Sequence, residues 1–484
     1  MYIKSTLLMA AALLAGCVLP PKESAHPAAL ENSRVGLSGV AVEPIPDAWW
    51  QSFGDPQLDR LIRAGLKDSP TLAEAQSRVA GALARSQLAE SKRLPNASLD
   101  ASALYQRAPQ NYIIPPPLAG HTFWMSQAGA SLGWDLDFFG KQADAVHSAQ
   151  ALTRSAALDL ESAKLMLDTA IVQSYVELYR ENALAQIAQR SAAQRENIVA
   201  ITRRRVAAGI DTQLELREAE GQLPQAHVAR DQAQSAADLA VHALAALTGQ
   251  GADAYAAITR PVLNLDAALP VPTALPINLL ARRPDVLAAR LDIEAADSQR
   301  LSDRAAFYPD INLKALAGIG AFGWSNLLQW SARGYGAGPL ISLPLFDGGR
   351  LRAQYRGSEA QLDSAIAIYN DTVLHAVQQT ADQLTRIDAL ARERVEQQQT
   401  LDATEAAYKL AEERYRAGLA SYLSVLNAET QVLTARQSMV DIIANQAVAR
   451  VTLLLASGGS FDARAADLPA AAPHSNPVLT RVTP

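Results

Sequence analysis

The chain contains the same pattern twice, about two hundred residues apart, and this duplication limits the folds open to it. A shift of 214 positions aligns residues 69–82 with 283–296, and a shift of 209 aligns 205–222 with 414–431. Because two independent shifts agree to within five positions, they indicate duplication and not shared composition. We therefore predict two structurally equivalent halves that contribute to one function.

Each copy contains one helical segment that is too long for an ordinary globular domain. Residues 142–207 have no proline or glycine, and 350–417 have only Gly357. At 1.5 Å per residue, about 66 residues form a helix on the order of 100 Å long. Shorter helices are predicted at 70–94, 211–248, 284–307 and 421–456. Their lengths, about 25 and 37 residues, add up to one long helix, so we expect two short helices stacked end to end beside each long one.

The long helix of the first copy has two apolar lines along its surface. One line is formed by Leu158, Leu165, Val172 and Tyr179, and the other by Leu160, Leu167, Ile171 and Leu178. A single line would suit a solvated two-helix coiled coil, which is the alternative. Two lines favour a helix with neighbours on both sides, as in a tube of helices.

Four segments, two in each copy, alternate between apolar and polar residues: 97–105, 124–138, 311–320 and 334–345. A period of two predicts β-strands, and about ten residues with aromatic ends is typical of strands in the outer membrane. A soluble sheet is the alternative. The proline-rich 106–123 and 322–333 are predicted to be loops.

A sheet of four strands cannot by itself span a membrane, because lipid offers no hydrogen-bond partners to the backbone groups of its two open edges. The chain must therefore oligomerise to complete a barrel. Two copies would give eight strands and a filled interior, and three would give twelve strands around a channel. Glycine and hydroxyl side chains on the polar face favour the twelve-stranded barrel.

The N-terminus resembles a bacterial lipoprotein export signal. Lys4 precedes a short apolar run, Leu7 to Leu14, which is too short to span a bilayer. The sequence Leu14-Ala-Gly-Cys17 then predicts removal of residues 1–16 and lipidation of Cys17, with an ordinary signal peptide as the alternative. Val18, in place of aspartate, favours the outer membrane. We predict no transmembrane helix elsewhere.

Composition and motifs argue against several classes of function. The net charge of −6 does not suit nucleic-acid binding, and Cys17 is the only cysteine. Residues 318–323 match GxGxxG, but they lie in an alternating segment with no helix after it, so we reject a dinucleotide site. The seven histidines show no metal-binding spacing, and no GxSxG or Walker motif is present. We therefore predict that the protein is not an enzyme and that it binds no cofactor and no metal.

These features resemble the outer membrane factor family, the trimeric TolC-like efflux ducts, and within it the lipid-anchored NodT/OprM-type branch. The resemblance covers roughly residues 17 to 457. It is carried by the LAGC sequence, Trp49-Trp50-Gln-Ser-Phe53-Gly-Asp55, Leu279-Leu-Ala-Arg-Arg-Pro-Asp-Val286, Phe307-Tyr-Pro309 and RxxxG at both predicted hairpin tips.

The resemblance implies an α+β membrane protein: a trimer with a twelve-stranded β-barrel, a long periplasmic α-helical barrel and a mixed equatorial collar. The implied divisions are a signal peptide (1–16), an anchored collar segment (17–66), a first repeat (67–248), a collar linker (249–283), a second repeat (284–457) and a tail (458–484). The implied function is a passive outer-membrane duct of a tripartite efflux system, which exports small toxic compounds from the Gram-negative cell. A periplasmic adaptor or a structural lipoprotein that spans the envelope is the alternative.

The resemblance also implies partners and site residues. The partners are two further copies, outer-membrane lipid, a periplasmic adaptor, and an inner-membrane pump of the RND or major-facilitator type. Adaptor docking would use the hairpin tips, at Arg205, Gly209, Arg414 and Gly418. The periplasmic aperture would be formed by Leu423 and Asn427, with Leu214 and Glu218 at the duplicate positions. Related lipoproteins have an acidic residue where this chain has Asn427, so a carboxylate ring at the second tip is in doubt.

Overall fold

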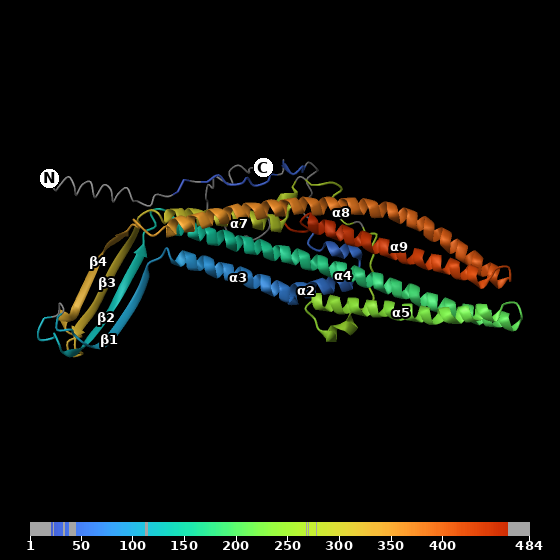
Figure 1. Cartoon of the computed structure of the whole chain (residues 1–484), viewed down its shortest axis with the longest axis horizontal. Helices are drawn as coiled ribbons and strands as arrows, with labels where there is room; N and C mark the ends of the chain where they lie inside the picture. The colour runs from blue at the N-terminus through green and yellow to red at the C-terminus, as the bar shows by residue number, and fades with distance from the viewer. Residues whose placement is uncertain are drawn as a thin grey trace.

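The computed structural model describes residues 21–22, 24–31, 34–37, 45–111, 115–267, 269, 271–276 and 278–462. The predicted signal peptide, Cys17 and most of the predicted tail lie outside the described residues. The molecule is elongated, with a sheet at one end and two helical hairpin tips at the other (Figure 1).

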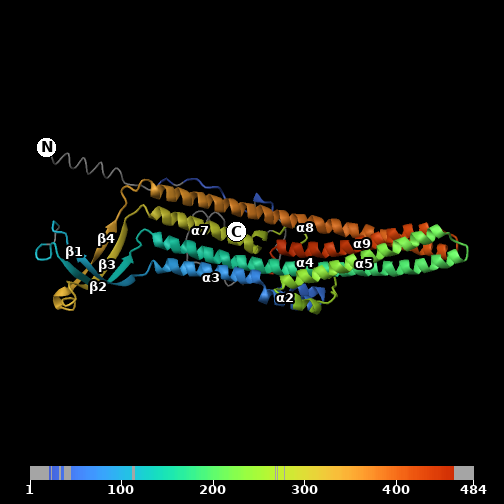
Figure 2. The same ribbon diagram turned by 60° about the horizontal axis from the view of Figure 1, so that its bottom comes forward.

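Two helices of 67 residues run along the molecule, as predicted: α4 (Lys141–Ala207) and α8 (Arg350–Arg416). Helices α3 (Pro70–Ser91) and α5 (Gln213–Leu247) lie beside α4, and α7 (Pro284–Ala305) and α9 (Tyr422–Ala456) lie beside α8. The expectation that two short helices stack beside each long one is confirmed. Figure 2 shows the same helices from another side.

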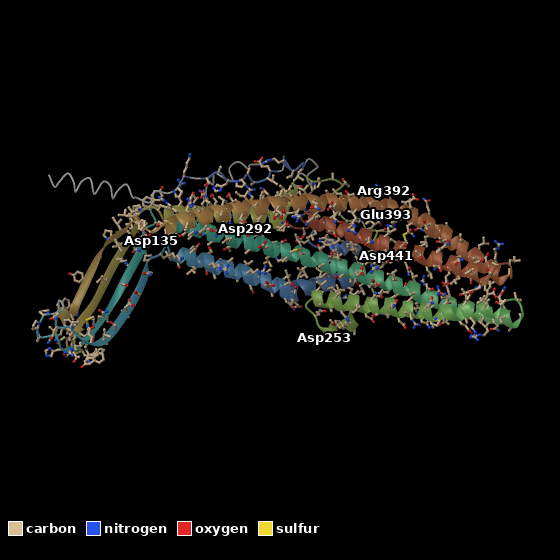
Figure 3. The ribbon with its side chains drawn as sticks, in the orientation of Figure 1. Asp135, Asp253, Asp292, Arg392, Glu393 and Asp441 are labelled. Atoms are coloured by element: carbon tan, nitrogen blue, oxygen red, sulfur yellow. The ribbon has the colours of Figure 1, made fainter. Side chains whose placement is uncertain are left out.

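Helix α4 is the central element, because it also contacts α7 and α9 of the second copy. All eight residues in its two predicted apolar lines bury their side chains or pack partly buried against a core cluster, among them Ile171 and Val172 with no exposed surface. Arg180 of α4 donates to Asp441 of α9 at 3.0 Å, and Figure 3 marks Asp441 on that helix. The prediction of a helix with neighbours on both sides is confirmed.

The four predicted strands form one antiparallel sheet in the order β1-β2-β3-β4. They are β1 (Asn96–Arg107), β2 (Thr122–Asp135), β3 (Asp310–Phe322) and β4 (Arg333–Ser342). Strands β1 and β4 are the two open edges. Each carries a row of backbone groups without a strand partner in the described chain, so the sheet is incomplete.

Two strands end earlier than their patterns predict. The sequence predicts strand through residues 138 and 345, but β2 ends at Asp135 and β4 at Ser342. The cause is the start of the long helices: Asp137 accepts the backbone N–H of Ala143 at 2.7 Å, and Asp347 accepts that of Leu351 at 2.8 Å. These carboxylates cap exposed helical N–H groups, so the chain leaves the sheet before the alternation ends.

The tryptophan motif near the N-terminus packs against the middle of α4. Trp49, Trp50 and Phe53 form the short helix η2 (Trp49–Phe53) and are buried. Asp55 accepts a hydrogen bond from the Tyr175 hydroxyl at 2.6 Å and caps helix α2 (Pro56–Asp68). The motif therefore fixes α2 across the long helix.

The second motif joins the start of α7 to the end of α9. Arg283 donates to Asp285 at 2.7 Å and to the backbone carbonyl of Ala456 at 3.2 Å. Arg282, in the short helix α6 (Leu279–Arg282), donates to the carbonyl of Gly459 at 3.0 Å. These contacts fix α6 and the start of α7 against the end of α9.

Two short 3-10 helices lie outside this contact. One, η3 (Ala252–Ala257), contacts α5, and the other, η4 (Trp330–Ala332), lies between β3 and β4 and contacts β3.

One described helix, α9, is long and apolar enough to cross a bilayer, although the sequence predicts no such helix. Half of its most apolar stretch is buried inside the protein, where α9 packs on α4 and α8. The apolar side chains of α9 therefore serve its packing against α4 and α8.

Candidate functional site

The two hairpin turns lie at the end of the molecule farthest from the sheet (Figure 1). Gly209 ends the first long helix with φ +70°, and Gly418 ends the second with φ +76°. Residues with side chains rarely adopt this left-handed conformation, which explains glycine at both turns. Gly209, Gly418 and Arg414 are exposed.

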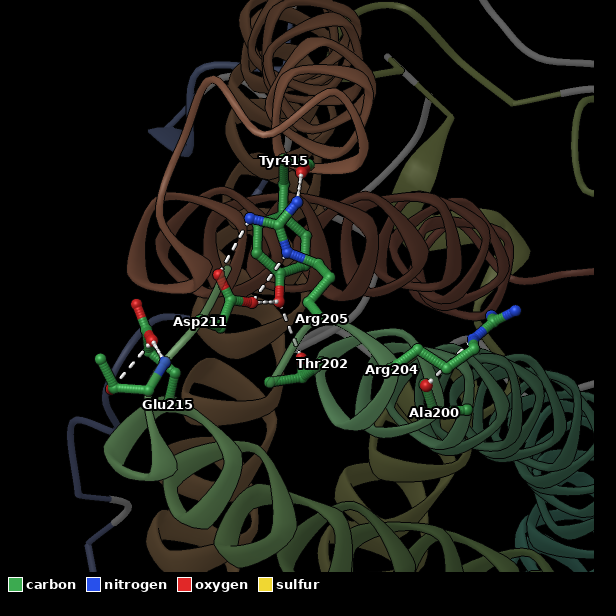
Figure 4. A network of polar contacts seen from close by, with 8 residues as sticks. Ala200, Thr202, Arg204, Arg205, Asp211, Glu215 and Tyr415 are labelled. Carbon is green, nitrogen blue, oxygen red and sulfur yellow. Dashed lines mark hydrogen bonds and ion pairs between the residues drawn. The ribbon is translucent and has the colours of Figure 1, made fainter. Parts of the chain in front are cut away.

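Arg205, the fourth predicted tip residue, is turned into the protein and connects the two hairpins (Figure 4). Its guanidinium binds both oxygens of Asp211, at 2.8 and 2.9 Å, and donates to the backbone carbonyl of Tyr415 on α8 at 2.7 Å. It also lies over the Tyr415 ring, 4.5 Å from the ring centre. A side-chain atom on Gly418 would come within 3.8 Å of the guanidinium, so the structure brings two predicted tip residues together.

The Tyr415 hydroxyl completes this connection. It donates to Asp211 at 2.8 Å and lies 2.8 Å from the hydroxyl of Thr202 on α4. Tyr415 and Thr202 are buried. Hydrogen bonds from Arg205 hold the pKa of Asp211 below its usual range, and burial raises the pKa of Tyr415 to about 12. At neutral pH the network therefore consists of one anion, one cation and a neutral phenol.

The predicted aperture residues lie on exposed helix faces. Leu214 of α5 and Leu423 of α9 keep 67% and 56% of their surface exposed, and Glu218 and Asn427 follow one turn later, also exposed. Within α9, the adjacent Tyr422 is buried. Leu423 thus points away from its own hairpin and is available to another copy, as a ring of leucines requires.

A buried carboxylate lies on α9 two residues after Asn427. Glu429 of α9 has 1% of its surface exposed and accepts from Arg195 of α4 at 3.4 Å. Arg195 also donates to the side chain and backbone of Gln222 on α5, at 2.9 and 3.2 Å. Burial raises the pKa of Glu429 more than Arg195 and Ser191 lower it. This chain of contacts joins three helices just above the tips.

The sheet has one apolar face and one face of small and polar residues. Strand pairing places Leu99, Ala130, Leu132, Ala317, Tyr335 and Ile341 on the apolar face. The opposite face has Ser98, Asp100, Gln127, Ser131, Asn312 and several glycines. In an outer-membrane strand these faces meet lipid and channel, respectively.

The GxGxxG match belongs to this sheet. Gly318 lies in β3 opposite Gly129, and a side-chain atom on it would lie 2.6 Å from the carbonyl oxygen of Ala128. The glycine therefore permits close strand contact. Among the described residues, no group of three or more histidine, cysteine, aspartate or glutamate side chains is placed to hold a metal ion.

Sequence reasoning missed the residues that hold the tips together: Asp211, Tyr415, Glu429 and their partners Thr202 and Arg195. A signal was present in the duplication. Asp211 corresponds to alanine in the second copy, and Tyr415 corresponds to valine in the first. Asp211 and Tyr415, the two partners that Arg205 binds, are therefore residues in which the copies differ.

The chain is similar to known efflux proteins along most of its length. The family model described as "Outer membrane efflux protein" matches residues 61–250 and 275–459. The fusaric acid resistance protein FusA of Burkholderia cepacia is 36% identical over 374 residues, 74% of this chain and 70% of that protein. The multidrug resistance outer membrane protein MdtP of Escherichia coli K12 is 30% identical over 474 residues, 95% of this chain and 96% of that protein.

The solved structure of the outer membrane protein VceC of Vibrio cholerae superposes with a TM-score of 0.80 at 32% identity, covering 86% of this chain and 100% of that chain. Proteins of this family are not enzymes; they are trimeric components of tripartite pumps. The duplicated match, the four strands and the long helices agree with this assignment. The chain therefore belongs to the outer membrane efflux protein family and is an outer-membrane channel of a Gram-negative efflux pump that extends into the periplasm.

Proposed function

We propose that three copies of this chain form a passive duct for small toxic organic compounds. The observation that carries this proposal is the incomplete sheet, whose open edges β1 and β4 require partners in lipid. Three copies give twelve strands, enough to surround a channel, and the small and polar face would line it. Lipidation of Cys17 would add an anchor in the same membrane.

The compound class is proposed from the relatives' names. One relative is named for resistance to fusaric acid, and another for multidrug resistance. A channel face that consists largely of glycine, serine and amide side chains, with few charges such as Asp100, offers little chemical discrimination, which suits compounds that a pump has already selected. An inner-membrane pump of the RND or major-facilitator type and a periplasmic adaptor would deliver them.

The periplasmic end would close through Leu423. Three exposed leucines around one axis form a dry constriction that water and ions cross poorly. Asn427, one turn further along the same face, adds polarity without fixed charge. Leu214 and Glu218 of the first copy would surround this ring.

Single-channel conductance in planar bilayers tests the aperture. We expect Leu423→Ser to raise the closed-state conductance several-fold, because a hydroxyl wets the constriction. Asn427→Asp should add cation preference without widening the pore. Leu214→Ser is the matched control and should change conductance less. Unchanged conductance and selectivity in both α9 variants would place the aperture elsewhere.

Adaptor docking at the tips is proposed from the exposed turns. Gly209, Gly418 and Arg414 are accessible, whereas Arg205 acts by fixing the position of the first turn. In a trimer the two similar turns would present six alternating contact points. Photocrosslinkers at residues 208 and 417, next to the glycines, should capture an adaptor in cells, while crosslinkers in the 323–329 loop should not. The reverse pattern would contradict docking at the tips.

A further inference from the structure

Two arginines lie at the end of the sheet that is farthest from the helices. Arg107 is the last residue of β1, and Arg333 is the first residue of β4. Both side chains are exposed. Because the helices extend into the periplasm, this end of the sheet faces the outside of the cell.

Both arginines are on the apolar face of the sheet. Alternation places Arg107 on the same face as Tyr105, and Arg333 on the same face as Tyr335. Tyr105 packs against Trp124 at 5.3 Å between ring centres, and Trp124 packs against Trp324 at 6.0 Å. Such aromatic residues mark the membrane–water interface of a barrel. The arginines lie two residues beyond the tyrosines, roughly 7 Å further out, at the level of lipid headgroups.

The sequence around these arginines contains no acidic residue. Residues 101–134 and 311–346 include no aspartate or glutamate, although they span most of the sheet and both outer loops. Arg107 donates through Nε to the carbonyl of Gly120 at 3.2 Å, and Arg333 stacks on Trp330 at 3.7 Å. In the described part of the chain, neither guanidinium takes part in an ion pair. These contacts orient both cations and leave their charge uncompensated.

Assembly brings the two arginines close to each other. Within one chain two strands separate β1 from β4. In the trimer proposed above, on which this inference rests, β1 of one copy pairs with β4 of the next. Arg107 and Arg333 of different copies then lie on neighbouring strands, roughly 5 Å apart between strand axes. Three such pairs occur around the barrel, one at each seam between copies.

We propose that each seam binds a phosphate group of the phosphorylated glycolipid in the outer leaflet. Guanidinium groups bind phosphate through paired, charge-assisted hydrogen bonds, and basic pockets at membrane surfaces recognise lipid headgroups. Below each pair, the apolar face offers Leu99, Ala101 and Ala103 on one side and Ala337, Pro339 and Ile341 on the other. These apolar side chains form a surface against which the acyl chains of the lipid lie. The arginines thus contact the phosphate group, and the apolar face contacts the acyl chains.

Native mass spectrometry of the full chain in detergent tests this site. The probes are diphosphorylated lipid A and the same lipid with its phosphates removed. We expect up to three lipid A adducts per trimer and far fewer of the dephosphorylated lipid. Arg107→Gln and Arg333→Gln should each lower the apparent affinity about tenfold, the effect of losing one charge-assisted contact. Arg93→Gln is the matched control, an exposed arginine just before the opposite end of β1, and should bind as the unmodified chain does.

The same spectra separate this inference from the proposed function. Trimers whose double variant retains lipid A normally would overturn the lipid site and leave the channel proposal intact. Equal retention of the dephosphorylated lipid would show that acyl burial alone drives binding, and would also overturn the site. Complete displacement by millimolar inorganic phosphate would identify a free-anion site instead. A folded monomer would overturn both proposals.

Discussion

The two hairpin tips occupy equivalent positions in the duplicated sequence, yet their polar side chains have different roles. In the first tip, Arg205 is largely buried and joins the turn to α8 through Asp211 and Tyr415. In the second tip, the equivalent Arg414 is exposed, and the nearby ion pair, Arg416 with Glu412, stays within α8. The arginine of the first copy thus connects the hairpins, and the equivalent arginine of the second copy stays exposed.

The carboxylates at positions 220 and 429 repeat this contrast. Glu220 is a surface residue whose pKa is lowered by hydrogen bonds from Arg203 and attraction to Arg217. Glu429, at the same place in the second copy, is buried against α4, and its pKa is raised. The two glutamates stand at equivalent sequence positions, yet the surroundings of Glu220 favour the charged carboxylate and those of Glu429 favour the neutral carboxyl group.

We expect the largest difference in stability between the two copies when the tip arginines are replaced. Arg205→Ala removes the bidentate contact with Asp211 and the bond to α8, and leaves a mostly buried carboxylate without its cation. We expect a loss of about 2 kcal/mol of local stability, a lower thermal midpoint and a higher closed-state conductance. Arg414→Ala should change the midpoint little, since exposed charges contribute about 0–1 kcal/mol. An equal or larger effect of Arg414→Ala would contradict the asymmetry.

The pH dependence of stability should have opposite signs at the two glutamates. The raised pKa of Glu429 means that its stabilising contribution is full below the ordinary carboxyl range and falls as the pH rises through the raised value. Glu429→Gln should therefore stabilise the protein at neutral pH and have little effect in acid.

The lowered pKa of Glu220 gives the reverse behaviour, because its contribution is present above the ordinary carboxyl range and is lost as the pH falls through the lowered value. Glu220→Gln should weaken the protein slightly at neutral pH and not in acid. Thermal midpoints of both variants from pH 3 to 8 measure this. If the pH dependence of the thermal midpoint changes in the same direction in both variants, the environments of Glu220 and Glu429 are alike and the contrast is wrong.

The smallest difference should come from the starts of the returning helices. The Glu215 carboxylate accepts the backbone N–H of Thr212 at 2.6 Å, while Ser421 and Ser424, at the duplicate positions, contact each other through hydroxyls at 3.3 Å. Glu215→Ala should cost about 1 kcal/mol, and Ser424→Ala close to nothing. Hydrogen exchange of the first turns of α5 and α9 reports each loss locally. If both variants lose the same protection from exchange, the starts of α5 and α9 are equally stable, which would contradict this prediction.

Much of the fold follows from local patterns. The absence of proline and glycine predicts α4, and the absence of proline with a single glycine predicts α8. The alternation predicts four strands, and Gly209 and Gly418 predict the ends of the long helices. The strand ends at residues 138 and 345 were misplaced because Asp137 and Asp347 cap helices, and alternation carries no information about such a bond. The aperture and docking residues follow from family resemblance and stay predictions.

The helices and strands, apart from two strand ends, the duplication and the need for an oligomer can be predicted from the sequence, because these depend on periodicity and on backbone hydrogen bonds that each segment must satisfy. Which of two similar residues is buried depends on how the helices pack. Arg205 and Arg414 stand at the same place in RxxxG, and Glu220 and Glu429 at the same place in the returning helices. Their charges, contacts and pKa values differ because the surrounding helices differ. Arg205 is turned toward Tyr415 of α8, whereas Arg414 is exposed. Glu429 is buried against Arg195 of α4, whereas Glu220 pairs with exposed arginines, so identical motifs meet different neighbours.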